Sequence, residues 1–224
     1  MMTPSQKLWS DVDRYFVDML VPADPALDAA LKNSEAAGLP AIQVAPNQGK
    51  LLHLLARVRA ARKILEIGTL GGYSTIWLAR ALPAGGRLVT LEYDPKHAAV
   101  AVENLRRAGL DGVVSVRVGA ALDSLPKIKA EGLGPFDLIF VDADKKNNPE
   151  YFQWALDLST AGSIIVIDNV VRDGAVLDEN SNNDDILGTR RAIEMMGKEP
   201  RVDATAIQTV GSKGYDGFAI ALVK

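Results

Sequence analysis

Three oxygen-bearing side chains follow two apolar runs in the second half of the chain. Asp142 ends the run 136–142, and Asp168 ends the run 163–168 with Asn169 directly after it. If these runs form neighbouring strands, their ends lie ~4.8 Å apart, and carboxylates that close repel unless one is protonated or a cation lies between them. Oxygen ligands suit Mg²⁺, Mn²⁺ or Ca²⁺ and not Zn²⁺. These residues therefore predict a divalent-cation site, although each aspartate could instead only cap the turn after its strand.

A glycine-rich turn in the first half of the chain predicts a second ligand. The apolar run 63–67 is followed by Gly68, Gly71 and Gly72, and then by a helical pattern. Glycines let a ligand approach the backbone, and the following helix directs its N-terminal amides at it. Glu92 ends the next apolar run, where a carboxylate can accept both hydroxyls of a ribose. Together these features predict a cofactor that contains adenosine.

The details of this turn favour S-adenosylmethionine (SAM) over NAD. A dinucleotide-binding turn has the pattern Gly-x-Gly-x-x-Gly, but Leu70 occupies the position of the middle glycine, which approaches the pyrophosphate. Glu66 adds a carboxylate that would repel a pyrophosphate and would tolerate the ammonium group of an amino-acid ligand. The alternative is a tight strand-to-helix turn that binds no ligand.

Four sequence blocks resemble those of a known family. They are residues 66–74 (Glu-Ile-Gly-x-x-x-Gly-Tyr-Ser), 92–95 (Glu-Tyr-Asp-Pro), 141–145 (Val-Asp-Ala-Asp-Lys) and 167–169 (Ile-Asp-Asn). From about residue 42 to the C-terminus, the chain is similar to the cation-dependent small-molecule O-methyltransferases, which include catechol O-methyltransferase and caffeoyl-coenzyme A O-methyltransferase. The resemblance implies a SAM-dependent enzyme whose seven-stranded sheet has an antiparallel last strand. It also implies a homodimer.

The resemblance assigns cofactor-binding residues by position. Glu92 would hold the ribose hydroxyls, and Ser74 and the backbone of Val44 would bind the carboxylate of the methionine part. The other residues that it places at the cofactor are Glu66, Gly68, Tyr73, Gly119, Ala120, Ala121 and Asp142. Ser74 could also cap the helix that follows the turn.

The resemblance also implies a reaction. A phenol with a pKa of about 10 is a weak nucleophile at neutral pH, and two oxygens bound to a divalent cation lose a proton more easily. Lys145 and Asp142 would be catalytic, with Lys145 as the general base and Lys146 as its rival. Without the motif, two adjacent lysines in a polar turn would indicate a solvated surface. The chain is thus predicted to transfer a methyl group from SAM to a hydroxyl of a small catechol-like acceptor.

The chain departs from its relatives at two places. Relatives often carry a polar side chain that meets the adenine amine, whereas Ala121 and Leu122 are apolar, so Asp123 or the backbone would take that role. Some relatives carry a carboxylate near the last hairpin that contacts the second acceptor hydroxyl, and residues 209–212 offer none. The polar loop 172–185 is a candidate lid over the acceptor.

The surrounding pattern explains how the chain would position these residues. Apolar runs alternate with helical patterns, which predicts an α/β fold with a doubly wound, mostly parallel sheet covered on both faces. The predicted strands are 63–67, 87–92, 113–118, 136–142 and 163–168, and the helices between them are 74–81, 95–108, 121–130 and 149–158. A helix over 184–196 precedes strands 204–210 and 217–223, which must pair antiparallel because their connection is short. Extra helices occupy residues 1–60, before the core of residues 61–224 in a single domain.

The composition limits the kinds of partner. With 224 residues, of which 48% are hydrophobic and 24% charged, the chain can bury a full core. Its net charge of −3 gives no reason to expect binding to nucleic acid or to an anionic membrane. The sequence contains no cysteine, no run of ~20 apolar residues and no signal-peptide pattern. We therefore expect a cytoplasmic enzyme, and the resemblance implies that its partner is a small phenolic acceptor.

Two other functions stay open at this point. A SAM-dependent methyltransferase could act on an amine, RNA or protein, although an amine is already a nucleophile and the chain has no basic face for RNA. A non-catalytic SAM-binding module would have no need of Lys145 or of the cation site. The N-terminal helix is amphipathic and could serve a homodimer or pack on the chain's own sheet. His53 and His97 have no predicted role.

Overall fold

The computed structural model describes residues 3–224. Its helices are α1 (Pro4–Leu20), α2 (Pro25–Ala36), α3 (Pro46–Val58), α4 (Tyr73–Ala79), α5 (Pro95–Arg107), α6 (Ala121–Ala130), α7 (Asn148–Asp157) and α8 (Asp184–Lys198), with short 3₁₀ helices η1 (Lys145–Asn147) and η2 (Arg172–Leu177). Its strands are β1 (Lys63–Ile67), β2 (Arg87–Glu92), β3 (Val114–Val118), β4 (Phe136–Val141), β5 (Ser159–Asp168), β6 (Val202–Gly211) and β7 (Gly214–Val223).

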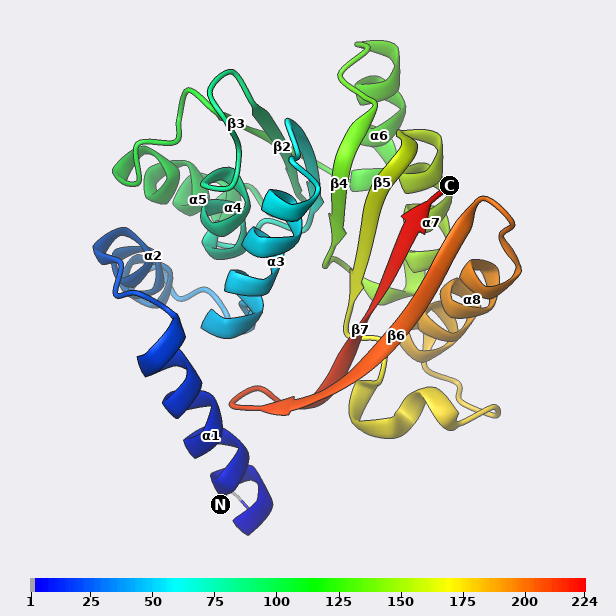
Figure 1. Ribbon diagram of the computed structural model, residues 1–224, viewed down its shortest axis with the longest axis horizontal. Helices are drawn as coiled ribbons and strands as arrows, with labels where there is room; N and C mark the ends of the chain where they lie inside the picture. The colour runs from blue at the N-terminus through cyan, green and yellow to red at the C-terminus, as the bar shows by residue number, and fades with distance from the viewer. Residues whose placement is uncertain (1–2) are drawn as a thin grey trace.

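Within these residues the strands form one seven-stranded sheet in the order β3-β2-β1-β4-β5-β7-β6 (Figure 1). The strands β1 to β5 pair in parallel, whereas β7 runs antiparallel to both β5 and β6. The predicted doubly wound fold with an antiparallel last strand is therefore confirmed. The strand order reverses between β1 and β4, and sheets of this kind bind ligands outside the carboxyl ends of their strands at that point.

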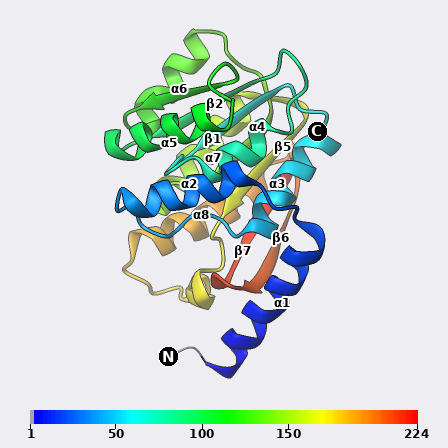
Figure 2. The same cartoon turned by 90° about the vertical axis from the view of Figure 1, so that its left-hand side faces the viewer.

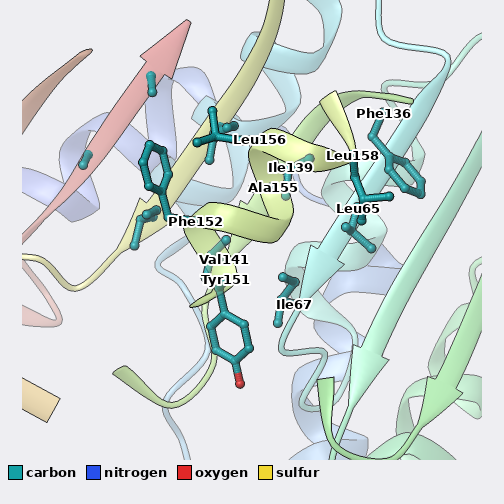
Figure 3. Packing of buried hydrophobic residues seen from close by; sticks show 14 of the residues in the cluster. Leu65, Ile67, Phe136, Ile139, Val141, Tyr151, Phe152, Ala155, Leu156 and Leu158 are labelled. Atoms are coloured by element: carbon teal, nitrogen blue, oxygen red, sulfur yellow. The ribbon is translucent and has the colours of Figure 1, made fainter. Parts of the chain in front are cut away.

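Helices cover both faces of the sheet (Figures 1 and 2). Alternate side chains of a strand point to opposite faces, so Leu65 and Ile67 join the core formed with α6, α7 and α8, whereas Ile64 joins the core formed with α2 to α5. Figure 3 shows part of the first core, in which Phe152 lies among apolar side chains while the hydroxyl of Tyr151 points away from them. Burial on both faces explains why the parallel strands are almost entirely apolar.

The C-terminal hairpin is longer and tighter than the sequence suggested. A connection over residues 211–216 was expected, but β6 and β7 extend to Gly211 and Gly214, so only Ser212 and Lys213 join them. Gly214 has a φ of 95°, which a glycine adopts without the steric cost that a side chain would add. This conformation closes the turn and places Lys213 at its tip.

The helix α1 extends from the body of the molecule beside the hairpin (Figures 1 and 2). Asp13 anchors it, because its carboxylate accepts hydrogen bonds from the Asn47 side chain (2.8 Å) and from the Ser212 backbone N–H (2.7 Å). The helix is amphipathic as predicted, but none of its residues is buried, and Tyr15 is 62% exposed. Six large apolar side chains of α1 thus remain exposed, although the helix also contacts β6 of the chain's own sheet. Among residues 3–224, no helix has both the length and the apolar character required to cross a membrane.

Candidate functional site

A cavity of about 990 Å³ opens at the carboxyl ends of β1, β2, β4 and β5. The predicted cofactor-binding residues that line it are Val44, Gly68, Tyr73, Ser74, Glu92, Gly119, Ala120, Ala121 and Asp142. The remaining predicted metal-binding and catalytic residues that line it are Lys145, Asp168 and Asn169. The fold thus brings together, in one hollow, residues that are separated by more than half the chain.

Gly68 follows β1 and lies against the backbone that follows β4. A Cβ atom at this position would lie 2.1 Å from the carbonyl oxygen of Asp142, and the φ of Gly68 is 102°. No other residue fits this space and this conformation without displacing the backbone. The glycine therefore serves the packing of the two strand ends, and through it the position of Asp142, as well as any approach by a ligand.

The Glu92 carboxylate holds the glycine-rich turn in place. Its Oε2 accepts backbone N–H groups from Thr69 (3.2 Å) and Leu70 (2.7 Å), and its Oε1 accepts that of Asp94 (2.9 Å). An ionised carboxylate offers about four acceptor positions, so these three bonds leave some acceptor capacity. Glu92 lines the cavity, and its remaining capacity is available to a ligand there.

Glu66 does not line the cavity, contrary to the expectation that it would face the ligand. Its side chain is fully buried on the same face of β1 as Ile64, because residues two apart in a strand share a face. The hydroxyls of Ser74, Thr75 and Thr90 donate to its carboxylate. Burial raises the pKa of Glu66 to about 7 despite these hydrogen bonds. The residue ties β1 to β2 and α4.

Two further details of the cofactor region correct the sequence interpretation. Ser74 does not cap α4, because the N-cap position is taken by Gly72, whose φ is 82°, and Ser74 lies inside the helix. Its hydroxyl instead donates to Glu66 at 2.7 Å. Asp123 is exposed and does not line the cavity, because α6 turns its apolar side to the core. Of the two groups expected to meet an adenine amine, the backbone near Gly119 lies at the cavity and Asp123 does not.

Asp142 and Lys145 form an ion pair beside the cavity. The Nζ of Lys145 donates to Oδ1 of Asp142 at 2.8 Å, and the two side chains are 7% and 23% exposed, respectively. The 3₁₀ helix η1 begins at Lys145 and allows this contact across three residues. Lys146 is exposed, and its backbone N–H donates to Asp185. Of the two lysines, Lys145 is therefore the one held inside the site.

Asp168 is a buried carboxylate at the end of β5, and β5 pairs with β4, the strand that Asp142 follows. It is 6% exposed, and it accepts hydrogen bonds from the Gln48 side chain (2.7 Å) and from the Asn169 backbone N–H (2.8 Å). Burial, and next the negative charge of Asp142, raise the pKa of Asp168 to about 7. Residues 3–224 contain no cluster of three His, Cys, Asp or Glu side chains suited to a metal, so the candidate site consists of two carboxylates and one amide.

Several cavity residues were not selected from the sequence, namely Gln48, His97, Tyr151 and Lys213. Gln48 is 120 positions from its partner Asp168, so no local motif signals the contact. The Nδ1 of His97 lies 3.6 Å from Oε1 of Glu92. Tyr151 belongs to the core, as expected, but its hydroxyl also donates to Asp144 at 2.6 Å. The predicted helix start at residue 95 was the one feature of the sequence that placed His97 in the first turn of the helix after Glu92.

The candidate lid contributes to the cavity only through its ends. In the loop 172–185, Arg172 and Asp185 line the cavity. The backbone N–H groups of Val171 and Arg172 both donate to Oδ1 of Asp216 at 3.0 Å, which ties the start of the loop to β7. The function of this loop as a lid stays a prediction.

Comparison with known proteins agrees with this site. The O-methyltransferase family model matches residues 23–221. A catechol O-methyltransferase of Niastella koreensis is 57% identical over 220 residues, covering 98% of this chain and 100% of the relative. A catechol O-methyltransferase of Mycobacterium tuberculosis is 58% identical over 214 residues, covering 96% of each chain.

Solved structures agree with the fold as well. An O-methyltransferase from Bacillus cereus in complex with SAH has a TM-score of 0.96 and 57% identity, covering 97% of this chain and 99% of that chain. An O-methyltransferase from Streptomyces achromogenes that is involved in tomaymycin synthesis, in complex with SAM, has a TM-score of 0.96 and 52% identity over 100% of both chains. The expectation of a SAM-dependent O-methyltransferase is confirmed at the level of enzyme class, and the chain belongs to the O-methyltransferase family.

Proposed function

We propose that this enzyme transfers the methyl group of SAM to a hydroxyl of a small vicinal diphenol, and that the reaction depends on a divalent cation. The observation that carries this proposal is the convergence of Asp142, Lys145, Asp168 and Asn169 at one end of a cavity whose other end holds Glu92. The catechol O-methyltransferases that are 57% and 58% identical to this chain support the acceptor class.

The Glu92 end of the cavity fits SAM. Glu92 would receive the ribose hydroxyls with the acceptor capacity that its three backbone bonds leave. Ser74 lies in the first turn of α4, where backbone N–H groups have no partner within the helix, and can offer its own N–H to the methionine carboxylate together with Val44. The solved relatives that contain SAH or SAM support this choice of cofactor. When bound, SAM supplies a methyl group that its sulfonium has already activated.

The opposite end fits a hard divalent cation. Asp142, Asp168 and Asn169 present oxygen atoms only, as Mg²⁺, Mn²⁺ or Ca²⁺ would require. The negative charge of Asp142 contributes to the raised pKa of Asp168, and this repulsion between carboxylates favours a cation between them. When bound, the cation supplies positive charge that acidifies and orients the acceptor hydroxyls.

Lys145 is the residue that we assign to proton transfer. Its ammonium group is buried and is held by Asp142, which restricts Nζ to the cation end of the cavity. In its neutral form, Nζ would accept the proton that leaves the attacking hydroxyl. Asp142 orients this amine, while Lys146, which also lines the cavity, is exposed and lacks that constraint.

Labelled methyl transfer from SAM to catechol, caffeate esters and flavonoids, with Mg²⁺ and with a chelator, tests the proposal. We expect transfer to a vicinal diphenol that stops on chelation and returns with added Mg²⁺. Transfer that survives chelation would reject the cation. Transfer only to amines, RNA or protein would favour the other methyltransferase interpretation, and SAM binding without any transfer would favour a binding module.

We also propose a homodimer in which a second copy covers α1. The helix exposes six large apolar side chains, which are Leu8, Val12, Tyr15, Phe16, Met19 and Leu20. A contiguous apolar surface of this kind is typical of an interface. Sedimentation velocity should give a dimer for the wild type and a monomer for Tyr15→Glu with Met19→Glu; a monomeric wild type would refute this. The cytoplasmic location stays a prediction.

A further inference from the structure

We infer that the acceptor of this enzyme carries a carboxylate in addition to its two hydroxyls, and that Lys213 and Arg172 bind that carboxylate. This inference rests on the proposed function, because it names the substituent that the same cavity selects. It follows from two cations at the acceptor end of the cavity that have no acidic partner.

Lys213 lies at the end of the cavity that holds the candidate cation site. A second hollow of about 440 Å³ adjoins the first, and the two share Gln48, Asp168, Asn169 and Lys213. None of the residues of the glycine-rich turn lines this second hollow. Lys213 and Asp168 therefore line both hollows, whereas the glycine-rich turn lines only the first.

The hairpin holds Lys213 in position without neutralising it. Its Nζ donates to the carbonyl oxygen of Ala41 at 2.9 Å, which uses one of three donor hydrogens. The two-residue turn between Gly211 and Gly214 limits the movement of its backbone. Asp13, which accepts the neighbouring Ser212 N–H, anchors the same turn from α1. The ammonium group is thus placed at the cavity wall with two donors to spare.

Arg172 lines the same cavity from the start of η2. Its φ of 57° is left-handed, a conformation that costs free energy for a residue with a side chain. The hydrogen bonds from the Val171 and Arg172 N–H groups to Asp216 maintain it. With this backbone conformation, Arg172 lines the cavity.

Several other charged groups of this end already have side-chain partners, whereas Lys146 is exposed. Lys145 is paired with Asp142, and Asp144 accepts the hydroxyl of Tyr151. Within residues 3–224, neither Lys213 nor Arg172 has a carboxylate oxygen within the 4.0 Å that defines a salt bridge. A divalent cation would balance Asp142 and Asp168, and Asp13 and Asp216 of the second hollow accept backbone N–H groups, so these nearby carboxylates are engaged elsewhere.

A carboxylate on the acceptor ring would give these two cations an acidic partner. Guanidinium and ammonium groups form short, charge-assisted hydrogen bonds to carboxylates. The catechol hydroxyls would occupy the cation end while the carboxylate reached the hairpin and the start of η2. A neutral catechol would leave both cations without a partner, and an acceptor with an ammonium group would be repelled.

Three acceptors that differ only in charge test the inference, namely 3,4-dihydroxybenzoate, its methyl ester and 3,4-dihydroxybenzylamine. We expect the wild type to prefer the benzoate in kcat/KM and the benzylamine to be the poorest. Lys213→Met and Arg172→Met should each lower kcat/KM for the benzoate about tenfold, while the value for the ester changes less than about threefold. Lys213→Glu should raise the value for the benzylamine relative to the benzoate. Lys213→Arg, which keeps the charge, should retain most of the preference.

Lys198→Met is the matched control, because it removes one exposed positive charge at the end of α8, outside the cavity. Calorimetric binding of 3,4-dihydroxybenzoate to the SAH-bound protein gives a readout that needs no turnover, and Lys213→Met should weaken it about tenfold. Equal losses for the benzoate and the ester would overturn the inference, since the lysine would then only support the hairpin. If the wild type methylated none of the three but still bound the benzoate through Lys213, the proposed function would fail and the anion site would stand.

Discussion

Two pairs of carboxylates lie near the carboxyl ends of neighbouring strands, and the pairs differ in the number of hydrogen bonds that they accept from the chain. Glu66 and Glu92, on β1 and β2, each accept three hydrogen bonds from hydroxyls or backbone N–H groups of the chain itself. Asp142 and Asp168, at the ends of β4 and β5, accept fewer: one from Lys145, and two from Gln48 and the Asn169 backbone, respectively. The first pair is largely satisfied by the fold, and the second pair keeps acceptor capacity for another group.

The comparison separates structural from chemical use of the same side chain. A buried carboxylate with three internal donors stabilises the elements that supply those donors. A carboxylate that lines a cavity with unused oxygens is costly to bury unless a cation or a ligand completes its partners. By this criterion Glu66 supports the sheet, Asp142 and Asp168 are the carboxylates that we propose for the reaction, and Glu92 is proposed for both uses.

The largest effect should come from removing a carboxylate of the β4–β5 pair. Asp168→Ala should lower kcat/KM about a thousandfold, because the cation would lose a charged ligand that contributes several kcal/mol to the transition state. SAM affinity, measured by calorimetry, should change less than about threefold. Asp123→Ala is a control on an exposed carboxylate outside the cavity and should have no effect. Turnover of Asp168→Ala close to that of the wild type would contradict the assignment of this carboxylate to the reaction.

The next effect concerns the partner of Asp142. Lys145→Met should reduce kcat about a hundredfold and change the pH dependence of kcat, because general base catalysis typically contributes at least that much. Lys146→Met should change kcat less than about threefold, because this side chain is exposed. A larger loss in Lys146→Met than in Lys145→Met would transfer the role of base to the neighbour.

A smaller, different effect is expected at Glu92. Glu92→Gln should weaken SAM binding about tenfold, since a charge-assisted hydrogen bond to a ribose hydroxyl becomes a neutral one. The kcat at saturating SAM should change little, in contrast to Asp168→Ala. The two constants are obtained from initial rates over a range of SAM concentrations. A loss in kcat alone, with unchanged SAM binding, would place Glu92 with the reactive pair.

The smallest effect on activity should come from substituting Glu66. This substitution should instead change how the unfolding free energy depends on pH. The pKa of Glu66 is raised from 4.5 to about 7 in the fold, so its contribution to stability is present below pH 4.5 and is lost as the pH rises through 7. Glu66→Gln cannot titrate, and its unfolding free energy relative to the wild type should therefore increase between pH 5 and pH 8, by about 3 kcal/mol. Urea unfolding at both pH values measures this. A constant difference would show that Glu66 does not titrate in this range.

Much of the fold could be predicted because its signals are local. Apolar runs alternating with helical patterns define β1 to β5 and their helices, and the short connection before β7 requires an antiparallel pair. The errors arise where one residue changes the geometry. Gly214 closes the hairpin after two residues, and Gly72 takes the cap position expected of Ser74. Both errors depend on backbone conformations that composition does not specify.

The site was predicted where motif residues themselves face the cavity, and missed where the partner is distant. Asp142, Lys145, Asp168 and Asn169 belong to motifs and line the cavity. Glu66 belongs to a motif but points to the other face of β1, because strand alternation and not proximity in sequence decides where a side chain points. The residue types alone gave no sign that Gln48 would hydrogen-bond to Asp168.

The sequence by itself determined the order of strands and helices along the chain, the family and the candidate residues for a cation and an adenosine, because these depend on residue types at short spacing. Only the tertiary structure decided which carboxylates are satisfied internally and which remain open to the cavity. It also decided that Lys213 and Arg172, which no motif connects, lie at the same end of that cavity. The physical reason is that hydrogen-bond saturation and charge balance depend on neighbours in space, and the parallel sheet brings those neighbours from segments far apart in the chain.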